Sequence, residues 1–435
     1  MPSFAIGICC KTLAGPRSAP RQHPMPITLL LDLDDTLLET NTETFLPAYY
    51  GALADYLRNQ VPPAELMAAL MSGIRLMLAN QDPTRTLQQV FEDVFYPRLA
   101  RSKGELRTAI NDFYASVFPT LETRTRIRPG ARELVEWALS QGHQLTIATD
   151  PVFPRQATLE RVRWAGLDPS QFDLISSFET FHFTKSHPAF FAEFIGRLGW
   201  PDRPVLMAGN DVQRDLVPAQ VLGLPTYHVN GAGRAESQSS EEISLAVSAS
   251  ARGDLVALRS WLQEARLEPY VQSLTNRDAV FAMLEATPAV LHGLTFGLTP
   301  ALWTGEPSRE DWALIELVCH LRDTEREVHH EQISRLIEDN VPFVPRPDAA
   351  VWAKQRKYLA EDGATALREL AAARMETVSR LKGVPDEIWL KPARHAIFGP
   401  TNFLEVVGFM ADHDRMHLQQ AWNTLTVLTR PAHRN

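Results

Sequence analysis

The sequence predicts two folded units in series: a doubly wound, Rossmann-type α/β domain with a parallel sheet, followed by an all-α four-helix bundle. Three observations predict this. Short apolar runs alternate with helical patterns within residues 26–268, further helical patterns interrupt the alternation at about 37–129, and residues 272–430 carry almost only helical periodicity. The length of 435 residues also favours two or three domains over one.

The parallel sheet is predicted from five short apolar runs, each followed by polar or turn-forming residues. Such runs are typical of buried parallel strands, whose C-terminal ends bring polar side chains to a common edge of the sheet. The five runs are residues 27–31, 145–148, 174–177, 205–208 and 226–229.

Helical patterns account for most of the remaining first unit. They separate the strands, form the insertion after the first strand, and close the unit. The patterns cover residues 46–58, 63–80, 86–99, 104–117, 131–140, 188–198 and 255–267. A stretch rich in Gly, Ser and Glu at 231–242 is typical of a loop.

The bundle is predicted from four helix starts, at Asn276, Ser308, Asp348 and Asn402. Ser308 and Asn402 each have an acidic residue three positions later, which is a variant of the capping box. Four long helices in sequence favour a helical bundle.

The composition excludes several classes of protein. A net charge of −9 argues against a general nucleic-acid binder, which would carry the opposite sign. No segment approaches the roughly 20 apolar residues of a membrane-spanning helix. Three cysteines, Cys9, Cys10 and Cys319, cannot form a disulfide framework, so we expect a cytoplasmic protein in a reducing compartment.

The first 25 residues are predicted to be a disordered extension, with the fold beginning near Met25. Residues 1–24 contain no acidic residue, which leaves an organellar transit segment as the alternative.

Acidic residues follow the first strand directly, in D-L-D-D-T at 32–36. A D-x-D pair is common by chance, but Asp32 and Asp34 follow a buried strand, and further polar residues come after it in order. These are Thr149 at a strand end, Lys185 in K-S-H-P-A-F-F, and Asp211 and Asp215 in G-N-D-V-Q-R-D at 209–215.

In these motifs the chain resembles the haloacid dehalogenase superfamily of phosphotransferases, over residues 27–267. The resemblance implies a Mg²⁺-dependent phosphoric monoester hydrolase (a phosphatase) with an aspartyl-phosphate intermediate. The insertion would be the family's helical cap, and the substrate a small phosphorylated metabolite. Asp34 favours phosphoryl chemistry, because the family's dehalogenases lack an acid/base at that position.

The residue types suit this chemistry. Asp32 can attack phosphorus as a nucleophile, and Asp34 can protonate the leaving oxygen and then deprotonate water. Oxygen ligands beside a phosphate favour Mg²⁺. Thr149 and Lys185 are predicted to stabilise the transferred oxygens, and the predicted Mg²⁺ site consists of Asp32, Asp34, Asp211 and Asp215.

Two features of this site depart from the family pattern. Asp150 follows Thr149 and adds a carboxylate where many relatives have asparagine. The acidic motif also allows two registers, since either Asn210 or Asp211 could supply the first metal ligand before Asp215. Asp211 is favoured, because a carboxylate neutralises a cation better than an amide.

A second candidate site lies in the bundle. His413 and His417 are four residues apart and share one helix face, within a stripe of apolar residues that should point into the bundle. Two imidazoles buried there need partners. His320, on an earlier helix, could complete three ligands with one position open.

With these histidines the chain resembles DinB-like (DinB/YfiT) bundles over residues 272–427. The match also includes the spacing from Trp312 to His320 and F-G-P-T at 398–401. The resemblance implies a second divalent metal on His320, His413 and His417, and imidazoles suit Zn²⁺ or Ni²⁺.

The bundle leaves several functions open. It could be the principal domain, as a metal-dependent thiol transferase using a low-molecular-weight thiol or as a metal or thiol sensor, or it could form a homodimer. His329 and His330 lie further along their helix and are expected to be solvated.

Overall fold

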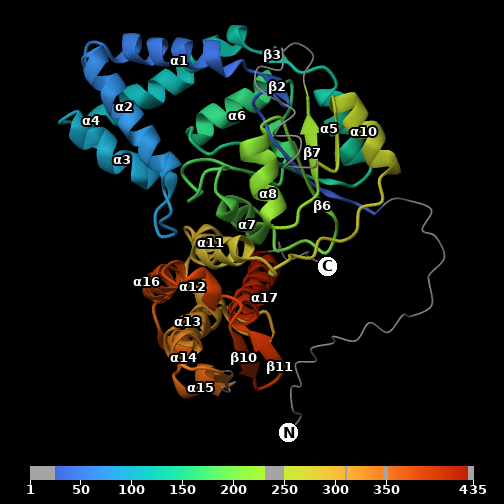
Figure 1. Ribbon diagram of the computed structural model, residues 1–435. Coiled ribbons are helices and arrows are strands. Elements are labelled where there is room, and N and C mark those ends of the chain that lie inside the picture. The colour runs from blue at the N-terminus through green and yellow to red at the C-terminus, as the bar shows by residue number, and fades with distance from the viewer. Residues whose placement is uncertain (1–24, 231–248, 309–310, 346–350, 430–435) are drawn as a thin grey trace, which may run out of the picture.

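The computed structural model describes residues 25–230, 249–308, 311–345 and 351–429. The predicted extension at 1–24, the predicted loop at 231–242 and the helix start at Asp348 lie outside these residues. Figure 1 shows an α/β core, a helical insertion at one side of it, and a helical bundle beneath. Within the described part of the chain, no helix combines the length and apolar character needed to cross a bilayer.

The predicted fold class is confirmed: the first unit is built on a six-stranded parallel sheet in the order β5-β4-β1-β6-β7-β8. The five predicted strands are present, and a sixth was missed because its sequence, Ala-Arg-Gly, has no apolar run. The strands are β1 Thr28–Leu31, β4 Gln144–Ile147, β5 Leu174–Ile175, β6 Val205–Gly209, β7 Thr226–Val229 and β8 Ala251–Gly253.

Both faces of the sheet are covered by helices, which explains why its central strands are mainly apolar. Leu29 and Leu31 belong to the same buried cluster as residues of α5 (Ala131–Ser140) and α10 (Leu255–Glu264). Leu30, which points to the opposite face, belongs to the cluster that contains α7 (Pro188–Arg197). A strand placed in this way at the centre of the sheet holds the residues that follow it firmly.

The predicted insertion is present as four helices, α1 Thr42–Leu57, α2 Pro63–Leu78, α3 Leu87–Arg98 and α4 Lys103–Asp112. Capping boxes start α3 at Thr86 and α4 at Ser102. Its two ends are joined by an antiparallel pair that the sequence did not predict, β2 (Leu38–Glu39) with β3 (Arg126–Ile127). After α5 and β4 comes α6 (Arg155–Trp164), which the sequence also did not predict because it is mostly polar.

The second unit is a helical bundle, as predicted. Its long helices are α11 Arg277–Thr295, α13 Leu314–Thr324, which continues through a wider turn at Glu325–His329 into α14 His330–Glu338, then α16 Gly363–Lys382 and α17 Phe403–Thr429. Asn276 caps α11, and Asn402 accepts from the Glu405 N–H at the start of α17.

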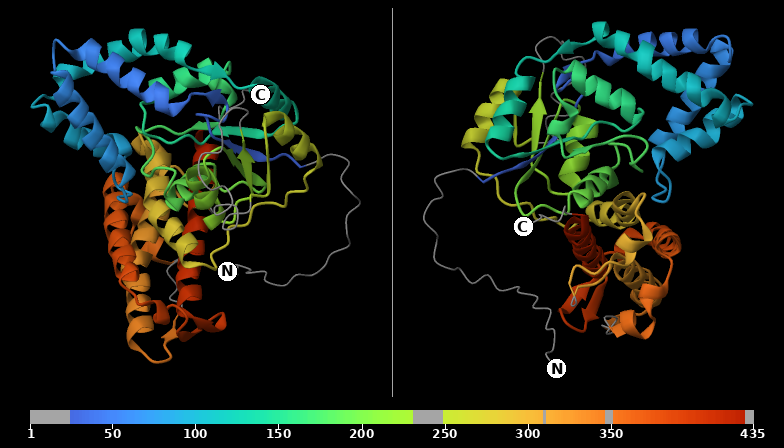
Figure 2. Two further views of the ribbon diagram at one scale, coloured as in Figure 1. Left: turned by 45° about the horizontal axis from the view of Figure 1, so that its top comes forward. Right: turned by 180° about the vertical axis from the view of Figure 1, so that it is seen from behind.

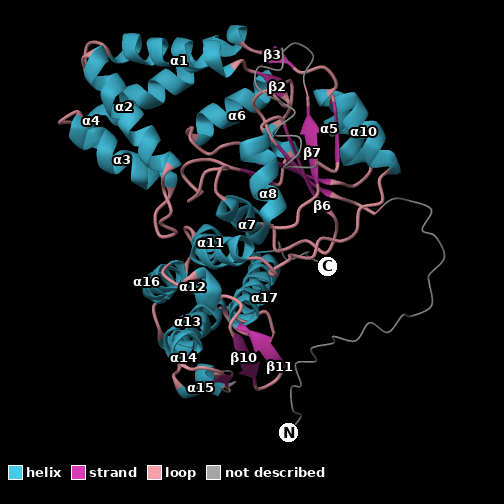
Figure 3. Ribbon diagram, in the orientation of Figure 1, coloured by secondary structure: helices cyan, strands magenta, loops and turns pink. Residues whose placement is uncertain are grey.

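Two predictions for the bundle are wrong. The helix expected after Ser308 begins at Leu314, with Ala313 as its N-cap, and the Asp311 N–H donates to the Ser308 backbone oxygen ahead of it. The bundle also carries a small sheet in the order β11-β10-β9 (Gly399–Asn402, Pro392–His395 and Phe343–Val344), visible in Figure 3. These strands are too short to show a periodic pattern.

The two units pack against each other through α7 and α11, and one buried apolar cluster runs across their boundary. Glu193 and His292 extend this contact with polar groups: His182 Nδ1 lies 2.8 Å from Glu193 Oε1, and His182 Nε2 lies 2.9 Å from His292 Nδ1. The bundle also reaches the insertion, since Lys382 donates to Gln81. Figure 2 shows the insertion and the bundle from two further sides of the core.

Candidate active site and histidine cluster

Asp32 lies at the carboxyl end of the central strand β1, where its backbone N–H donates to Ala208 O on β6. Its carboxylate is only 5% exposed and accepts a hydrogen bond from Thr36 Oγ1 at 2.8 Å. Burial raises the pKa of Asp32 to about 7, although Lys185 opposes the shift. A carboxylate held so deep needs positive charge beside it to stay ionised.

Lys185 supplies part of that charge. Its ammonium donates to Asp32 Oδ1 at 2.6 Å and forms an ion pair with Asp215, and all three side chains are buried. Although burial opposes it, the carboxylates of Asp215 and Asp32 raise the pKa of Lys185 above its usual value. Gly209 makes room for Asp215, because a Cβ there would lie 2.1 Å from Asp215 Oδ2.

Asp34 is held from two sides. Thr40 Oγ1 donates to its Oδ1 at 2.8 Å, and Arg161 forms an ion pair with its Oδ2. Arg161 is 1% exposed and lies over the Phe153 ring, 4.2 Å from the ring centre. The buried guanidinium therefore fixes the orientation of the Asp34 carboxylate.

Asn210 is the alternative to Asp211 as the first metal ligand. Its side chain points to the residues that follow β1. One terminal atom of its amide lies 3.2 Å from Asp32 Oδ2 and 3.1 Å from the backbone oxygen of Asp34. Asp211 also lines the cavity, but its carboxylate accepts from the N–H groups of Gln213 and Arg214 and is 43% exposed. The geometry thus brings Asn210, rather than Asp211, to Asp32.

The remaining predicted residue, Thr149, is buried at the end of β4. Ser176 Oγ donates to its backbone oxygen at 2.6 Å. The additional carboxylate, Asp150, accepts from the Lys185 backbone N–H at 3.2 Å and lies 3.6 Å from Arg214. It therefore positions the loop that carries Lys185.

These side chains form the floor of a cavity of about 710 Å³ between the sheet and the insertion. Asp32, Asp34, Thr149, Lys185 and Asp215 all line it. A substrate that enters the cavity would therefore meet the predicted nucleophile and the predicted acid together.

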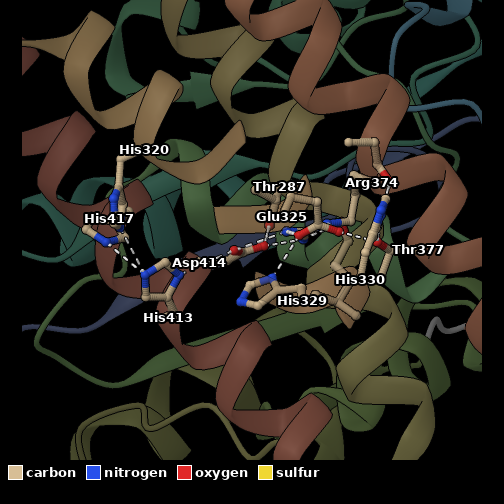
Figure 4. Close-up of polar contacts among 12 residues, drawn as sticks. Thr287, His320, Glu325, His329, His330, Arg374, Thr377, His413, Asp414 and His417 are labelled. Atoms are coloured by element: carbon tan, nitrogen blue, oxygen red, sulfur yellow. Dashed lines mark hydrogen bonds and ion pairs between the residues drawn. The ribbon is translucent and has the colours of Figure 1, made fainter. Parts of the chain in front are cut away.

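In the bundle, the three predicted histidines converge (Figure 4). His413 Nε2 lies 3.3 Å from His320 Nε2 and 3.2 Å from His417 Nε2. One nitrogen atom from each of the three rings lies within 4.8 Å of the other two. This spacing allows all three to bind one metal ion. The Trp312 ring is stacked on His417 at 6.1 Å and meets His320 edge-on at 5.0 Å.

The protonation state of the cluster suits metal binding, because a metal binds neutral imidazole. Burial and the neighbouring histidines lower the pKa of His320 to about 2 and that of His417 to about 3. In addition, His320 Nδ1 and His413 Nδ1 are buried without a hydrogen-bond partner. The neutral rings of His320 and His417, whose Nε2 atoms both face that of His413, fit a late first-row divalent cation.

Beside the histidines lies a fully buried charged network, also shown in Figure 4. Arg374 is sandwiched between Glu325 and Asp414, and each of the three side chains is at most 1% exposed. Asp414 follows His413 directly, with 4.0 Å between Asp414 Oδ1 and His413 Nδ1. The expectation that His329 is solvated is wrong: it is buried, 2.9 Å from Glu325 Oε2.

Sequence reasoning missed Arg161, Arg374 and Glu325. Arg161 lies on the unpredicted helix α6 among other arginines, and Glu325 and Arg374 resemble ordinary surface charges of a helix. Arg161 contacts Asp34 and Arg374 contacts Asp414, and each contact joins residues far apart in the chain. No local sequence pattern distinguishes these residues from other charged residues.

Comparison with known proteins gives matches for both units. Residues 28–223 match the haloacid dehalogenase-like hydrolase family, and residues 283–421 match the DinB superfamily. No curated protein matches the chain.

Solved structures with similar parts include a haloacid dehalogenase-type phosphatase from Thermococcus onnurineus, at 20% identity and a TM-score of 0.37, covering 56% of this chain and 100% of that one. A 2-haloacid dehalogenase from Pseudomonas syringae pv. Tomato has 21% identity and a TM-score of 0.40, covering 55% and 99%. The four-helix bundle protein YfiT from Bacillus subtilis has 17% identity and a TM-score of 0.32, covering 37% and 92%.

The two matched segments correspond to the two folded units and contain both sets of converging side chains. The chain therefore joins a haloacid dehalogenase-like hydrolase domain to a DinB superfamily domain.

Proposed function

We propose that the first domain is a Mg²⁺-dependent phosphoric monoester hydrolase that works through an aspartyl-phosphate on Asp32. The observation that carries the proposal is the position of Asp32 at the floor of the cavity. Its carboxylate is buried against Lys185 and Thr36, with the Asp34 side chain in the same cavity. A buried carboxylate with a second carboxylate beside it suits two-step phosphoryl transfer.

In the first step, an Asp32 carboxylate oxygen attacks phosphorus while the ester P–O bond breaks, and Asp34 gives its proton to the leaving oxygen. In the second step, Asp34 takes a proton from water, the water oxygen attacks phosphorus, and the bond to Asp32 breaks to release phosphate. Lys185 and Thr149 stabilise the negative charge on the transferred oxygens. Arg161 holds the Asp34 carboxylate in position for both transfers.

The donor set would fit Mg²⁺: Asp32 Oδ2 and the backbone oxygen of Asp34 lie beside one terminal atom of the Asn210 amide, and that amide would offer its oxygen to a cation when turned so that its oxygen faces them. Bound there, Mg²⁺ would neutralise charge on the phosphate and on Asp32. We expect phosphate release from small phosphate esters to require added Mg²⁺ and to stop when EDTA is present in excess. Release that continues undiminished in EDTA would contradict the proposal.

For the metal register, the geometry leads us to propose Asn210 in place of the predicted Asp211. Asn210→Ala should raise the Mg²⁺ concentration for half-maximal activity roughly 10- to 100-fold, the range found even for residues that only support a ligand. Asp211→Ala, which removes an exposed helix cap, should change it little. A Mg²⁺ titration of both variants tests this, and a larger effect in Asp211→Ala would restore the predicted register.

For the second domain, we propose that His320, His413 and His417 hold a divalent metal such as Zn²⁺ or Ni²⁺ with one position open. The converging Nε2 atoms support this. We expect metal analysis of the purified protein to find one transition metal per chain, lost in His320→Ala, His413→Ala and His417→Ala. His395→Ala, a histidine of the same domain outside the cluster, should keep it, and unchanged metal in all three cluster variants would remove the proposal.

An open metal position could activate a thiol or water. A thiol transferase or sensor therefore remains the second candidate function, with a low-molecular-weight thiol as its ligand. His413 Nε2 lies 3.3 Å from His320 Nε2 and 3.2 Å from His417 Nε2, and a single cation bound by all three nitrogens would favour this geometry over a purely structural cluster.

A further inference from the structure

The cavity above Asp32 is larger than a phosphate group requires. Its volume of about 710 Å³ lies within the range of cavities that hold drug-sized ligands. Phosphate would occupy only the floor beside Asp32 and Lys185. The rest of the space must receive the group to which the phosphate is attached, so the walls of the cavity describe that group.

Those walls are mainly aromatic and aliphatic side chains of the insertion. They include Tyr49 and Leu53 of α1, Leu70 of α2, and Phe91 and Phe95 of α3. The Phe91 and Phe95 rings are stacked, with centres 4.8 Å apart. These side chains offer apolar surface beyond the phosphate site.

The hydroxyls of Tyr49 and Tyr114 are engaged with each other. Tyr49 Oη and Tyr114 Oη lie 2.7 Å apart in a buried hydrogen bond, in which one hydroxyl donates to the other. Burial keeps both phenols neutral by raising the pKa of Tyr49 to about 12 and that of Tyr114 well above its usual value. Tyr49 therefore adds ring surface rather than free hydrogen-bonding groups.

Thr42, Lys103, Arg107 and Asn111 are all solvent-exposed lining residues, and Lys103 pairs with Glu92 at 2.7 Å. The half-buried side chains of Gln88 and Glu92 also line the cavity, so its insertion wall is mainly apolar with a minority of polar groups.

We propose that this cavity selects phosphate monoesters whose alcohol or phenol part is a large apolar group, a long alkyl chain or a fused aryl system, over sugar phosphates. The hydroxyls of a sugar would lose water against the aromatic wall without gaining partners, which is costly. An apolar group gains by leaving water there. The inference rests on the proposed phosphatase activity and narrows its substrate class.

The first test compares kcat/KM across methyl, butyl, octyl and decyl phosphate, 1-naphthyl phosphate, glycerol 1-phosphate and glucose 6-phosphate. We expect kcat/KM to rise about three- to fourfold for each added methylene until the cavity is filled, and 1-naphthyl phosphate to exceed both polyol phosphates. Equal or higher kcat/KM for the polyol phosphates would overturn the inference while leaving the phosphatase proposal intact.

A variant tests whether the insertion wall is responsible. Ile74 of α2 lines the cavity, whereas Leu76 of the same helix is 43% exposed and lies outside it. Ile74→Trp should lower the ratio of kcat/KM for decyl phosphate to that for methyl phosphate at least tenfold, and Leu76→Trp should leave the ratio unchanged. An unchanged ratio in Ile74→Trp would overturn the inference.

Binding without turnover separates the inference from the proposed activity. Calorimetry on Asp32→Asn with Mg²⁺ should show decyl phosphate binding at least tenfold more tightly than glucose 6-phosphate, with a negative heat-capacity change. If the variant binds in this way but the wild-type protein hydrolyses no ester, the apolar binding site is supported and the phosphatase proposal is overturned. Binding of glucose 6-phosphate equal to or tighter than that of decyl phosphate would overturn the inference itself.

Discussion

Replacement of Asp32 by asparagine is expected to lower phosphate release by on the order of 10⁴-fold or more, as is found when the nucleophile of a covalent mechanism is removed. Asparagine has nearly the same shape and can keep the contact with Thr36, but its amide is a poor nucleophile toward phosphorus. Lys185 retains its second partner, Asp215. Initial rates with Mg²⁺ and the best ester of the panel measure the loss.

The control is the same substitution at an aspartate that precedes a strand of the same sheet instead of following one. Asp173 directly precedes β5 and is exposed, and it accepts a hydrogen bond from Gln144. Asp173→Asn should have wild-type activity. Residual activity within tenfold of wild type in Asp32→Asn would mean that Asp32 is not the nucleophile, and the search for the main activity would move to the histidine cluster.

The sequence was sufficient to predict those parts of the first domain in which burial produces a run of apolar residues. The central strands are apolar on both faces because helices cover both faces, and Asp32 could be placed because it follows such a strand. The same logic fails at the edge of the sheet. Strand β8, Ala251–Gly253, pairs on one side only and has no apolar run.

The choice between Asn210 and Asp211 as the proposed metal ligand depends on the residue at which strand β6 ends. Strand β6 continues to Gly209, so Asn210 comes next at the sheet edge, beside Asp32. Asp211 then caps the helical turn Val212–Leu216. Charge alone favours Asp211, and the end of the strand could not be read from the sequence to that accuracy.

The histidine cluster was predictable only in part. The spacing of His413 and His417 places both on one helix face, but the choice of His320 over His329 depends on tertiary packing. His329 points to Glu325 instead. The buried charged network beside the cluster could not be predicted from local sequence patterns, because Glu325, Arg374 and Asp414 come from three different helices.

Replacement of Arg374 by methionine is expected to destabilise the bundle by about 3–5 kcal/mol, the cost of leaving buried charge without its partner. Arg374 donates to Glu325 and Asp414, both fully buried. Against the effect of burial, Arg374 lowers the pKa of both carboxyls. The variant would keep Glu325 and Asp414 buried near each other without the guanidinium, with Thr287, Thr377 and His329 as their remaining side-chain neighbours. Chemical unfolding followed by circular dichroism measures the change.

Arg368 gives a matched control, because it lies on the same helix, is exposed, and donates only to Thr365 nearby. Arg368→Met should change the free energy of unfolding by no more than about 0.5 kcal/mol. The cause can be separated from lost packing by adding Glu325→Gln and Asp414→Asn to Arg374→Met. With all three charges of this network removed, the triple variant should be more stable than Arg374→Met alone. If the triple variant is less stable instead, the arginine stabilises the bundle by packing, and the network is not held together by its charges.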